Sequence, residues 1–194
     1  MIRNSRRRAL ILGFLALWVL AGGLAPAVAG PYRDYAVQLT TRAPEGSQFR
    51  PDLEEALAQL ANRYRASESL ETLTPDPLFQ IAARAHAADM MLHDFMGHRA
   101  STGHDFDSRM RAFVDDITRF PGLAENAARD SQKTPADAAK ARRLFQQWVK
   151  SRPHRKTLRS RDYAFVSTGV IQRGQVIWAV QIFWSAPRQK GMFQ

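Results

Sequence analysis

The chain has 194 residues, no cysteine, and 28 Lys and Arg residues against 18 Asp and Glu residues, for a net charge of +10. The lack of cysteine excludes a disulfide framework and a thiol nucleophile, and therefore cysteine-protease chemistry. The positive charge favours anionic polymers as partners. The sequence has no recognisable nucleic-acid-binding motif, so we expect no nucleic-acid partner.

The first 29 residues are typical of a secretory signal peptide. A basic run from Arg3 to Arg8 precedes an apolar stretch from Ala9 to Leu24 and the small-residue segment Ala27–Ala29. We expect cleavage after this segment; the alternative is an uncleaved membrane anchor. Cleavage leaves 24 basic against 18 acidic residues, a net charge of +6, and no membrane span. The protein is then exported, either periplasmic or secreted, and both the general and the twin-arginine routes stay open.

Residues 30–50 mix Pro, Gly, Ser and Thr with charged residues and show no sustained period, so we expect an extended lead-in. One domain should follow over residues 51–187, with a short tail over 188–194. Helical spacing of apolar residues predicts a first helix from Pro51 to about Arg65. A second helix should run from Asp76-Pro77 to Gly97. A third should start at Thr134-Pro135, with Asp137 in a capping role, and end at Pro153.

The end of the domain changes period. Residues 163–171 and 175–184 are rich in β-branched and aromatic residues and flank Gln172-Arg173-Gly174, which predicts a hairpin. Both alternating faces of the second strand are largely apolar, so helices should cover the sheet on both sides. The expected fold class is α+β: an α-β-α sandwich with a small antiparallel sheet flanked by helices on both faces.

Three residues are the leading candidates for chemistry. His98 and His154 each lie just beyond a predicted helix end, and Glu125 stands between them in sequence. Two imidazoles and a carboxylate can hold a divalent metal with an open position, or serve as acid and base. Spacing alone does not bring residues so far apart in sequence together in space.

A competing set lies on the second predicted helix, where His86, Asp89 and His93 share a face. We expect that face to be an exposed or rim surface without partners from other segments. Ser101 follows His98 but lacks the glycines of a nucleophile elbow, so a turn or capping role is expected.

Basic residues crowd around His154. A solvated loop is the ordinary interpretation of such a run, and its charge should lower the pKa of His154. These residues are Arg152, Arg155, Lys156, Arg159 and Arg161.

Several segments, in this order and spacing, together resemble the CAP superfamily, also called SCP-like, and in particular its small bacterial secreted branch. They are residues 62–65, 82–90, Gly97-His98 with Ser101, Gly103 and Arg109, Glu125-Asn126, Trp148, residues 151–155, Gly169-Val170 and residues 178–183. The resemblance runs from about Pro51 to Trp184. It implies an α-β-α sandwich whose cleft gathers His98, Glu125 and His154, with Ser101 and Ser151 as secondary cleft candidates.

The resemblance does not determine the activity, because relatives are described as divalent-metal binders, lipid or sterol binders, proposed proteases and cell-wall factors. We expect a ligand-binding or divalent-metal-binding envelope or secreted module. Zn or Ca is the metal to consider, with His98, His154 and Glu125 as its ligands. An anionic envelope polymer, a lipid or a peptide is the expected class of partner. The alternative is a hydrolase of an envelope polymer or peptide that uses a metal or the His/Glu set. A structural envelope protein with a relict cleft is a third interpretation.

Overall fold

The computed structural model describes residues 32–188, so the expected leader over 1–29 and all but the first residue of the expected tail lie outside the described residues. The elements follow in the order α1 (Tyr32–Thr41), β1 (Ser47–Phe49), α2 (Pro51–Ser67), β2 (Thr74–Pro75), α3 (Gln80–Leu92), α4 (Phe106–Arg111), a 3-10 turn (Ile117–Arg119), β3 (Leu123–Asp130), α5 (Ala138–Lys150), α6 (Arg152–Arg159), β4 (Phe165–Arg173) and β5 (Val176–Trp184).

The five strands form one open sheet, in which four strands follow the order β1-β4-β5-β3 and β2 pairs with β4 off this path. β4 and β5 make the expected hairpin, and β3 pairs antiparallel with β5 along its whole length. The short strands β1 and β2 occupy opposite ends of the outer edge of β4. β1 runs antiparallel to β4, whereas β2 runs parallel to it. β3 is therefore one edge of the sheet.

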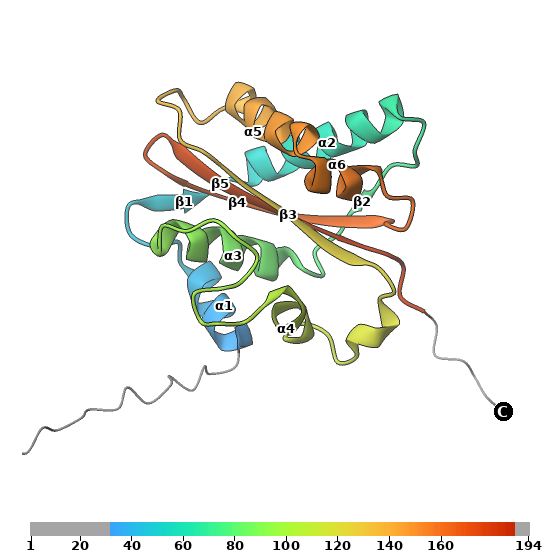
Figure 1. Cartoon of the computed structure of the whole chain (residues 1–194). Helices are drawn as coiled ribbons and strands as arrows, with labels where there is room; N and C mark the ends of the chain where they lie inside the picture. Colours follow the sequence, from blue (N-terminus) through green and yellow to red (C-terminus); the bar gives the residue numbers. More distant parts are fainter. Residues whose placement is uncertain (1–31, 189–194) are drawn as a thin grey trace, which may run out of the picture.

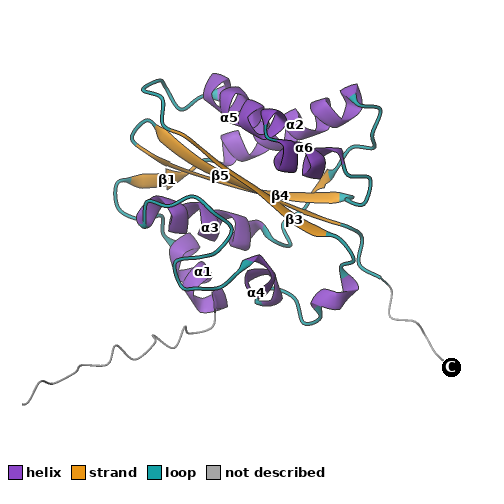
Figure 2. Ribbon diagram, viewed as in Figure 1, coloured by secondary structure: helices purple, strands orange, loops and turns teal. Residues whose placement is uncertain are grey.

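The helices cover both faces of this sheet, which confirms the predicted α-β-α sandwich. α2, α5 and α6 lie on one face, and α3 lies on the other with α1 and α4 outside it (Figures 1 and 2). β5 shows why both faces must be covered. Its side chains alternate between the two cores, with Ile177, Ala179 and Phe183 toward α2 and α5, and Trp178, Val180 and Ile182 toward α3.

The expected extended lead-in is wrong, because residues 32–41 form α1 and residues 47–49 form β1. α1 buries only a narrow stripe, in which Tyr32 and Ala36 pack beside Ala85 of α3. Such a stripe is too short to produce a sustained period, and this is why the sequence did not reveal the helix.

The starts of α3 and α5 also differ from expectation, and α3 ends at Leu92 and not at Gly97. α3 begins at Gln80 because the segment from Asp76 forms a turn in which its carboxylate accepts the N–H of Leu78. Asp137 is itself the N-cap of α5, accepting the N–H groups of Ala139 and Lys140.

The basic run around His154 is a helix for most of its length and was wrongly expected to be a loop. Pro153 lies in the first turn of α6, where its missing N–H costs nothing. Leu158 anchors the helix by packing fully buried into the core beneath α2 and α5. The chain therefore restarts a helix at the proline that was expected only to end one.

Candidate functional site

Glu125 lies on the edge strand β3, and its carboxylate is almost completely buried. Nη2 of Arg109 in α4 donates to both of its oxygens, at 2.8 Å each. Burial alone would raise the pKa of Glu125, but the charge of Arg109 and a hydrogen bond from His98 outweigh it and lower the pKa to about 2. Glu125 is therefore an ionised acceptor with both oxygens engaged.

His98 lies in the loop after α3, with Nδ1 2.9 Å from Oε1 of Glu125. Because Glu125 is ionised, Nδ1 carries the proton and donates it, which leaves Nε2 as the lone-pair atom whenever the ring is neutral. This bond raises the pKa of His98. The imidazole is 54% exposed, and no other described residue bonds to the ring. It is a fixed ring that presents one nitrogen outward.

His86 of α3 also lies beside the carboxylate of Glu125. Its Nε2 lies 2.8 Å from the carbonyl oxygen of Gly97, which can only accept, so Nε2 carries the hydrogen. The same nitrogen is 3.7 Å from Oε1 of Glu125. Burial lowers the pKa of His86, which keeps the ring neutral. His86 therefore adds an N–H dipole beside Glu125.

His154 reaches the cleft from α6, on the other face of the sheet. Its ring centroid is 6.4 Å from that of His98, with the ring planes at 72°. The pKa of His154 is lowered, first by burial and then by the charge of His98. The expected direction agrees with this, but the expected cause, the neighbouring basic run, does not.

The Glu125-Asn126 pair on β3 brings the two histidines together. Consecutive strand residues point to opposite faces of a sheet. Glu125 thus holds His98 from the α3 face, and Nδ2 of Asn126 donates to the carbonyl of His154 on the other face at 3.1 Å. Two adjacent residues therefore position segments that lie far apart in the chain.

The structure thus brings His98, Glu125 and His154 together but gives them different surroundings. Within residues 32–188, no group of three or more His, Cys, Asp and Glu side chains is arranged to hold a metal ion. The engagement of both Glu125 oxygens by Arg109 explains why the carboxylate does not join the two imidazoles as a third donor.

The secondary candidates lie in different places. Ser101 donates to Asp89 through both its hydroxyl and its N–H, and Tyr35 of α1 donates to the same carboxylate at 2.7 Å. Ser101 is therefore part of the α1–α3 contact. Ser151 lies between α5 and α6 and lines a hollow of about 440 Å³ together with His154.

The expectation for the helix-two set is wrong for two of its members. His86 and Asp89 are fully buried, and both bond to other segments: His86 to Gly97, and Asp89 to Tyr35 and Ser101. Only His93 is exposed, with Nε2 3.6 Å from Asp89. The shared helix face was recognised, but its burial could not be, because alanines surround it and leave little apolar signal.

Arg109 was not recognised as a site residue from the residues alone. It lies in a six-residue helix with other charged side chains, so the sequence does not indicate that its guanidinium is completely buried. Burial of an arginine requires a partner charge. Glu125, 16 residues later, is that partner.

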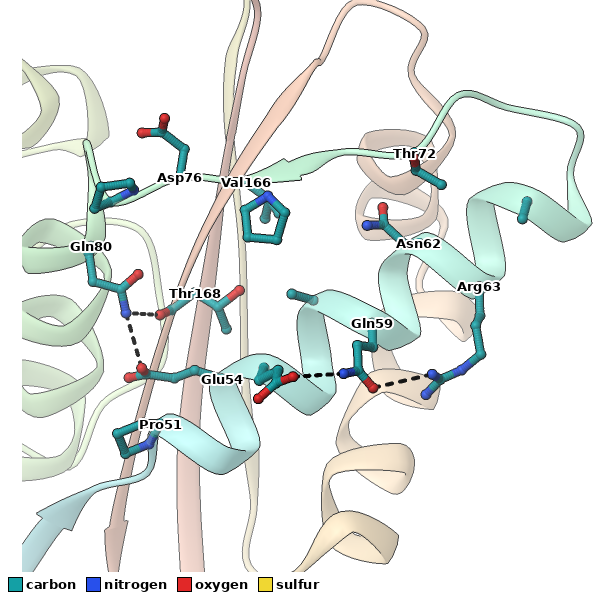
Figure 3. A pocket seen from close by; sticks show the side chains of 15 residues that line it. Pro51, Glu54, Gln59, Asn62, Arg63, Thr72, Asp76, Gln80, Val166 and Thr168 are labelled. Carbon is teal, nitrogen blue, oxygen red and sulfur yellow. Dashed lines mark hydrogen bonds between the residues drawn. The ribbon is translucent and has the colours of Figure 1, made fainter.

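A larger hollow of about 780 Å³ lies at the opposite edge of the sheet, between α2 and the segment around β2. Figure 3 shows its residues; Nε2 of Gln80 donates to Glu54 at 3.1 Å and to the carbonyl of Thr168. Glu54 also accepts two bonds from Arg84. This hollow contains no histidine, so we place the candidate site at the β3 edge despite its smaller volume.

Comparison with known proteins identifies the family of the chain. The model of the CAP family, the cysteine-rich secretory protein family, matches residues 58–183. The chain therefore belongs to the CAP family. No curated protein sequence matches it.

Solved structures of bacterial proteins share the fold. One is an outer surface protein from Borrelia burgdorferi, with 15% identity and a TM-score of 0.61 over 72% of this chain and 98% of that one. Another is an extracellular protein containing a SCP domain from Bacillus anthracis, with 23% identity and a TM-score of 0.57 over 71% of this chain and 44% of that one. A cysteine-rich secretory protein from Staphylococcus aureus has 18% identity and a TM-score of 0.50 over 70% of this chain and 38% of that one.

Among residues 32–188, no helix is both long enough and apolar enough to cross a bilayer.

Proposed function

We propose that this CAP domain is an exported binding module that holds a divalent metal between His98 and His154, with Glu125 positioning His98. The observation that carries the proposal is the pairing of a carboxylate-oriented imidazole with a second imidazole whose ring centroid is 6.4 Å away. Metal-binding histidines commonly donate their other N–H to a carboxylate, which fixes the ring and its tautomer.

The donor chemistry favours Zn²⁺ over Ca²⁺. Zn²⁺ accepts imidazole nitrogen, whereas Ca²⁺ requires several oxygen ligands. Glu125, the buried carboxylate beside His98, already accepts from Arg109 and His98. Two protein ligands leave positions for a ligand of the module, and a bound Zn²⁺ would act there as a Lewis acid.

Calorimetric titration with ZnCl₂ tests this proposal. The wild type should bind one equivalent, and His98→Ala and His154→Ala should each weaken binding by about tenfold or more. His93→Ala is the matched control, because this ring is also about half exposed, at 52%, but follows the last residue of α3 and lies beside Asp89. Equal binding by the wild type and both cleft variants would refute the metal site.

A hydrolase is the alternative function, favoured by the same His98–Glu125 pair. A histidine oriented by a buried carboxylate is the arrangement of a general base, and a water molecule would be the attacking group. A screen with peptidoglycan and peptides, with and without Zn²⁺, distinguishes the two functions. Turnover that is lost in both His98→Ala and His154→Ala would replace the binding function with the hydrolase. No turnover together with histidine-dependent Zn²⁺ binding supports the module.

Export is the second part of the proposal. It is supported by the basic, apolar and small-residue order of residues 1–29. The extracellular and outer-surface names of the structural relatives agree with it. N-terminal sequencing of the protein from the periplasm or medium should give a start near Gly30. Intact protein starting at Met1 in the membrane fraction would contradict cleavage.

A further inference from the structure

The outer edge of β3 presents unpaired main-chain groups beside the two histidines. The N–H of Ser185 donates to the carbonyl of Gly122 at 3.0 Å, which fixes the even-numbered residues of this strand as those facing β5. The odd-numbered residues therefore face outward. By this register the main-chain N–H and C=O groups of Glu125 and Ala127 point away from β5, and they make no main-chain hydrogen bond to another described element.

A groove follows this edge. The hollow of about 440 Å³ is lined by residues 127–129 of β3, by Met96 from the loop after α3, and by Trp148 and His154 from α5 and α6. A second hollow of about 600 Å³ continues past Asp130 along α5. Gln147 lines both hollows, and its Nε2 donates to the main-chain carbonyl of Arg129 at 3.1 Å, so the unpaired part of this edge is limited to Glu125 and Ala127. Ala127 and Ala128 contribute only small side chains to the lining of this groove.

The α5 side of the groove is positively charged. Arg142 and Lys150 line the second hollow, are exposed, and have no acidic partner among the described residues. Arg129 and Arg143, by contrast, pair with Asp94 and Asp130. The unpaired cations favour an anionic partner on this side.

One residue that lines the first hollow carries a buried hydrogen-bond donor without an acceptor. Trp148 lines the first hollow and is completely buried, and its indole N–H has no hydrogen-bond partner among the described residues. Buried N–H groups are normally satisfied. Trp148 therefore brings an unsatisfied donor to the set of residues that line the first hollow.

We propose that the outer edge of β3 binds an acidic peptide in an extended conformation, as an added strand that ends beside His98 and His154. Strand addition uses main-chain hydrogen bonds for affinity, and its side chains alternate between the two walls of the groove. Acidic side chains would face α5, and apolar side chains would face Met96. The proposal rests on the proposed function only in placing one end of the peptide at the histidine pair.

A fluorescent six-residue peptide of alternating Glu and Val tests strand addition by anisotropy, in buffer with EDTA so that metal plays no part. Two further peptides carry N-methyl groups on every Val or on every Glu. Only one set of amides can face β3, so one methylated peptide should lose affinity by about tenfold or more while the other keeps it. Equal binding of both, or no binding of the parent peptide, would overturn the proposal.

Charge-reversal variants test the placement of the peptide. Arg142→Glu combined with Lys150→Glu should weaken binding of the parent peptide by about tenfold or more. The matched control, Arg33→Glu combined with Arg63→Glu, changes charge equally on α1 and α2, away from the groove. Equal losses in both would show nonspecific attraction and contradict the groove. If the wild type binds the peptide but does not bind Zn²⁺, only the proposed metal site is refuted.

Discussion

His98 Nδ1 lies 2.9 Å from Oε1 of Glu125, and this hydrogen bond fixes which nitrogen of the ring faces outward. The carboxylate cannot turn away to follow solvent or a ligand, because Arg109 holds both of its oxygens. Glu125 is therefore a positioning residue that acts through His98.

The first prediction concerns the order in which the two cleft histidines titrate. The hydrogen bond to Glu125 raises the pKa of His98 above its ordinary value of 6.5, while burial and the charge of His98 lower the pKa of His154 below it. As pH falls through this range, His98 should be protonated first. Imidazole proton NMR over pH 4 to 9 measures the order directly. His154 titrating at the higher pH would show that Glu125 does not act on His98 as described.

The second prediction concerns the buried charge pair. Glu125→Gln leaves the guanidinium of Arg109 buried without its counter-charge, which should cost about 3 kcal/mol in the free energy of unfolding at pH 7. Urea unfolding measures this loss. Combining it with Arg109→Met should cost less than the two single losses added together, because no lone charge is then buried. Additive losses would contradict a direct coupling.

Protonation of Glu125 at low pH should reproduce part of this loss of stability. The folded state lowers the pKa of Glu125 from 4.5 to about 2, so its contribution to stability is complete above about pH 4.5. That contribution is lost as pH falls from 4.5 toward 2. The wild type should therefore lose more stability across this interval than Glu125→Gln. Parallel unfolding curves for the two proteins over pH 2 to 5 would count against it.

A third prediction concerns the packing of α3 on the sheet. A Cβ on Gly169 of β4 would lie 2.6 Å from the carbonyl oxygen of Ala83 and still closer to neighbouring backbone atoms of α3. Gly169→Ala should therefore destabilise the protein by about 3 kcal/mol or more, since a backbone cannot yield as a side chain can. Gly97→Ala is the control, with no atom within 4 Å of the added methyl and an expected change below about 0.5 kcal/mol. Thermal unfolding of both variants checks the difference.

Sequence reasoning succeeded where apolar period was strong. The apolar residues on both alternating faces of β5 predicted that helices cover both sides of the sheet, and the side chains of β5 enter the two cores alternately. Leu78, Ile81 and Leu92 of the second predicted helix are exposed, although their spacing had indicated one apolar face. β3 was not recognised as a strand, because it is rich in alanine and carries Glu125, Asn126 and Asp130 on buried positions. A polar strand of this kind is stabilised by its partners in space, which local propensity does not encode.

The candidate site depended still more on tertiary contacts. The spacing of His98, Glu125 and His154 could not show that they meet; the resemblance to CAP proteins supplied that expectation. Neither spacing nor resemblance indicated that Arg109 would occupy both carboxylate oxygens. The division of roles, with two outward imidazoles and one inward carboxylate, follows only from the fold.

The most direct test of the account is nitrogen-15 NMR of the imidazole side chains during a titration with ZnCl₂ near pH 7.5. Coordination shifts the resonance of the bonded nitrogen, so Nε2 of His98 and one ring nitrogen of His154 should both shift and saturate at one equivalent. His86 and His93 should be unaffected, because His86 is buried with its Nε2 hydrogen on the carbonyl of Gly97 and His93 lies beside Asp89. Saturating shifts confined to His93, or no shift at His98 and His154, would contradict the claim that these two residues form one site.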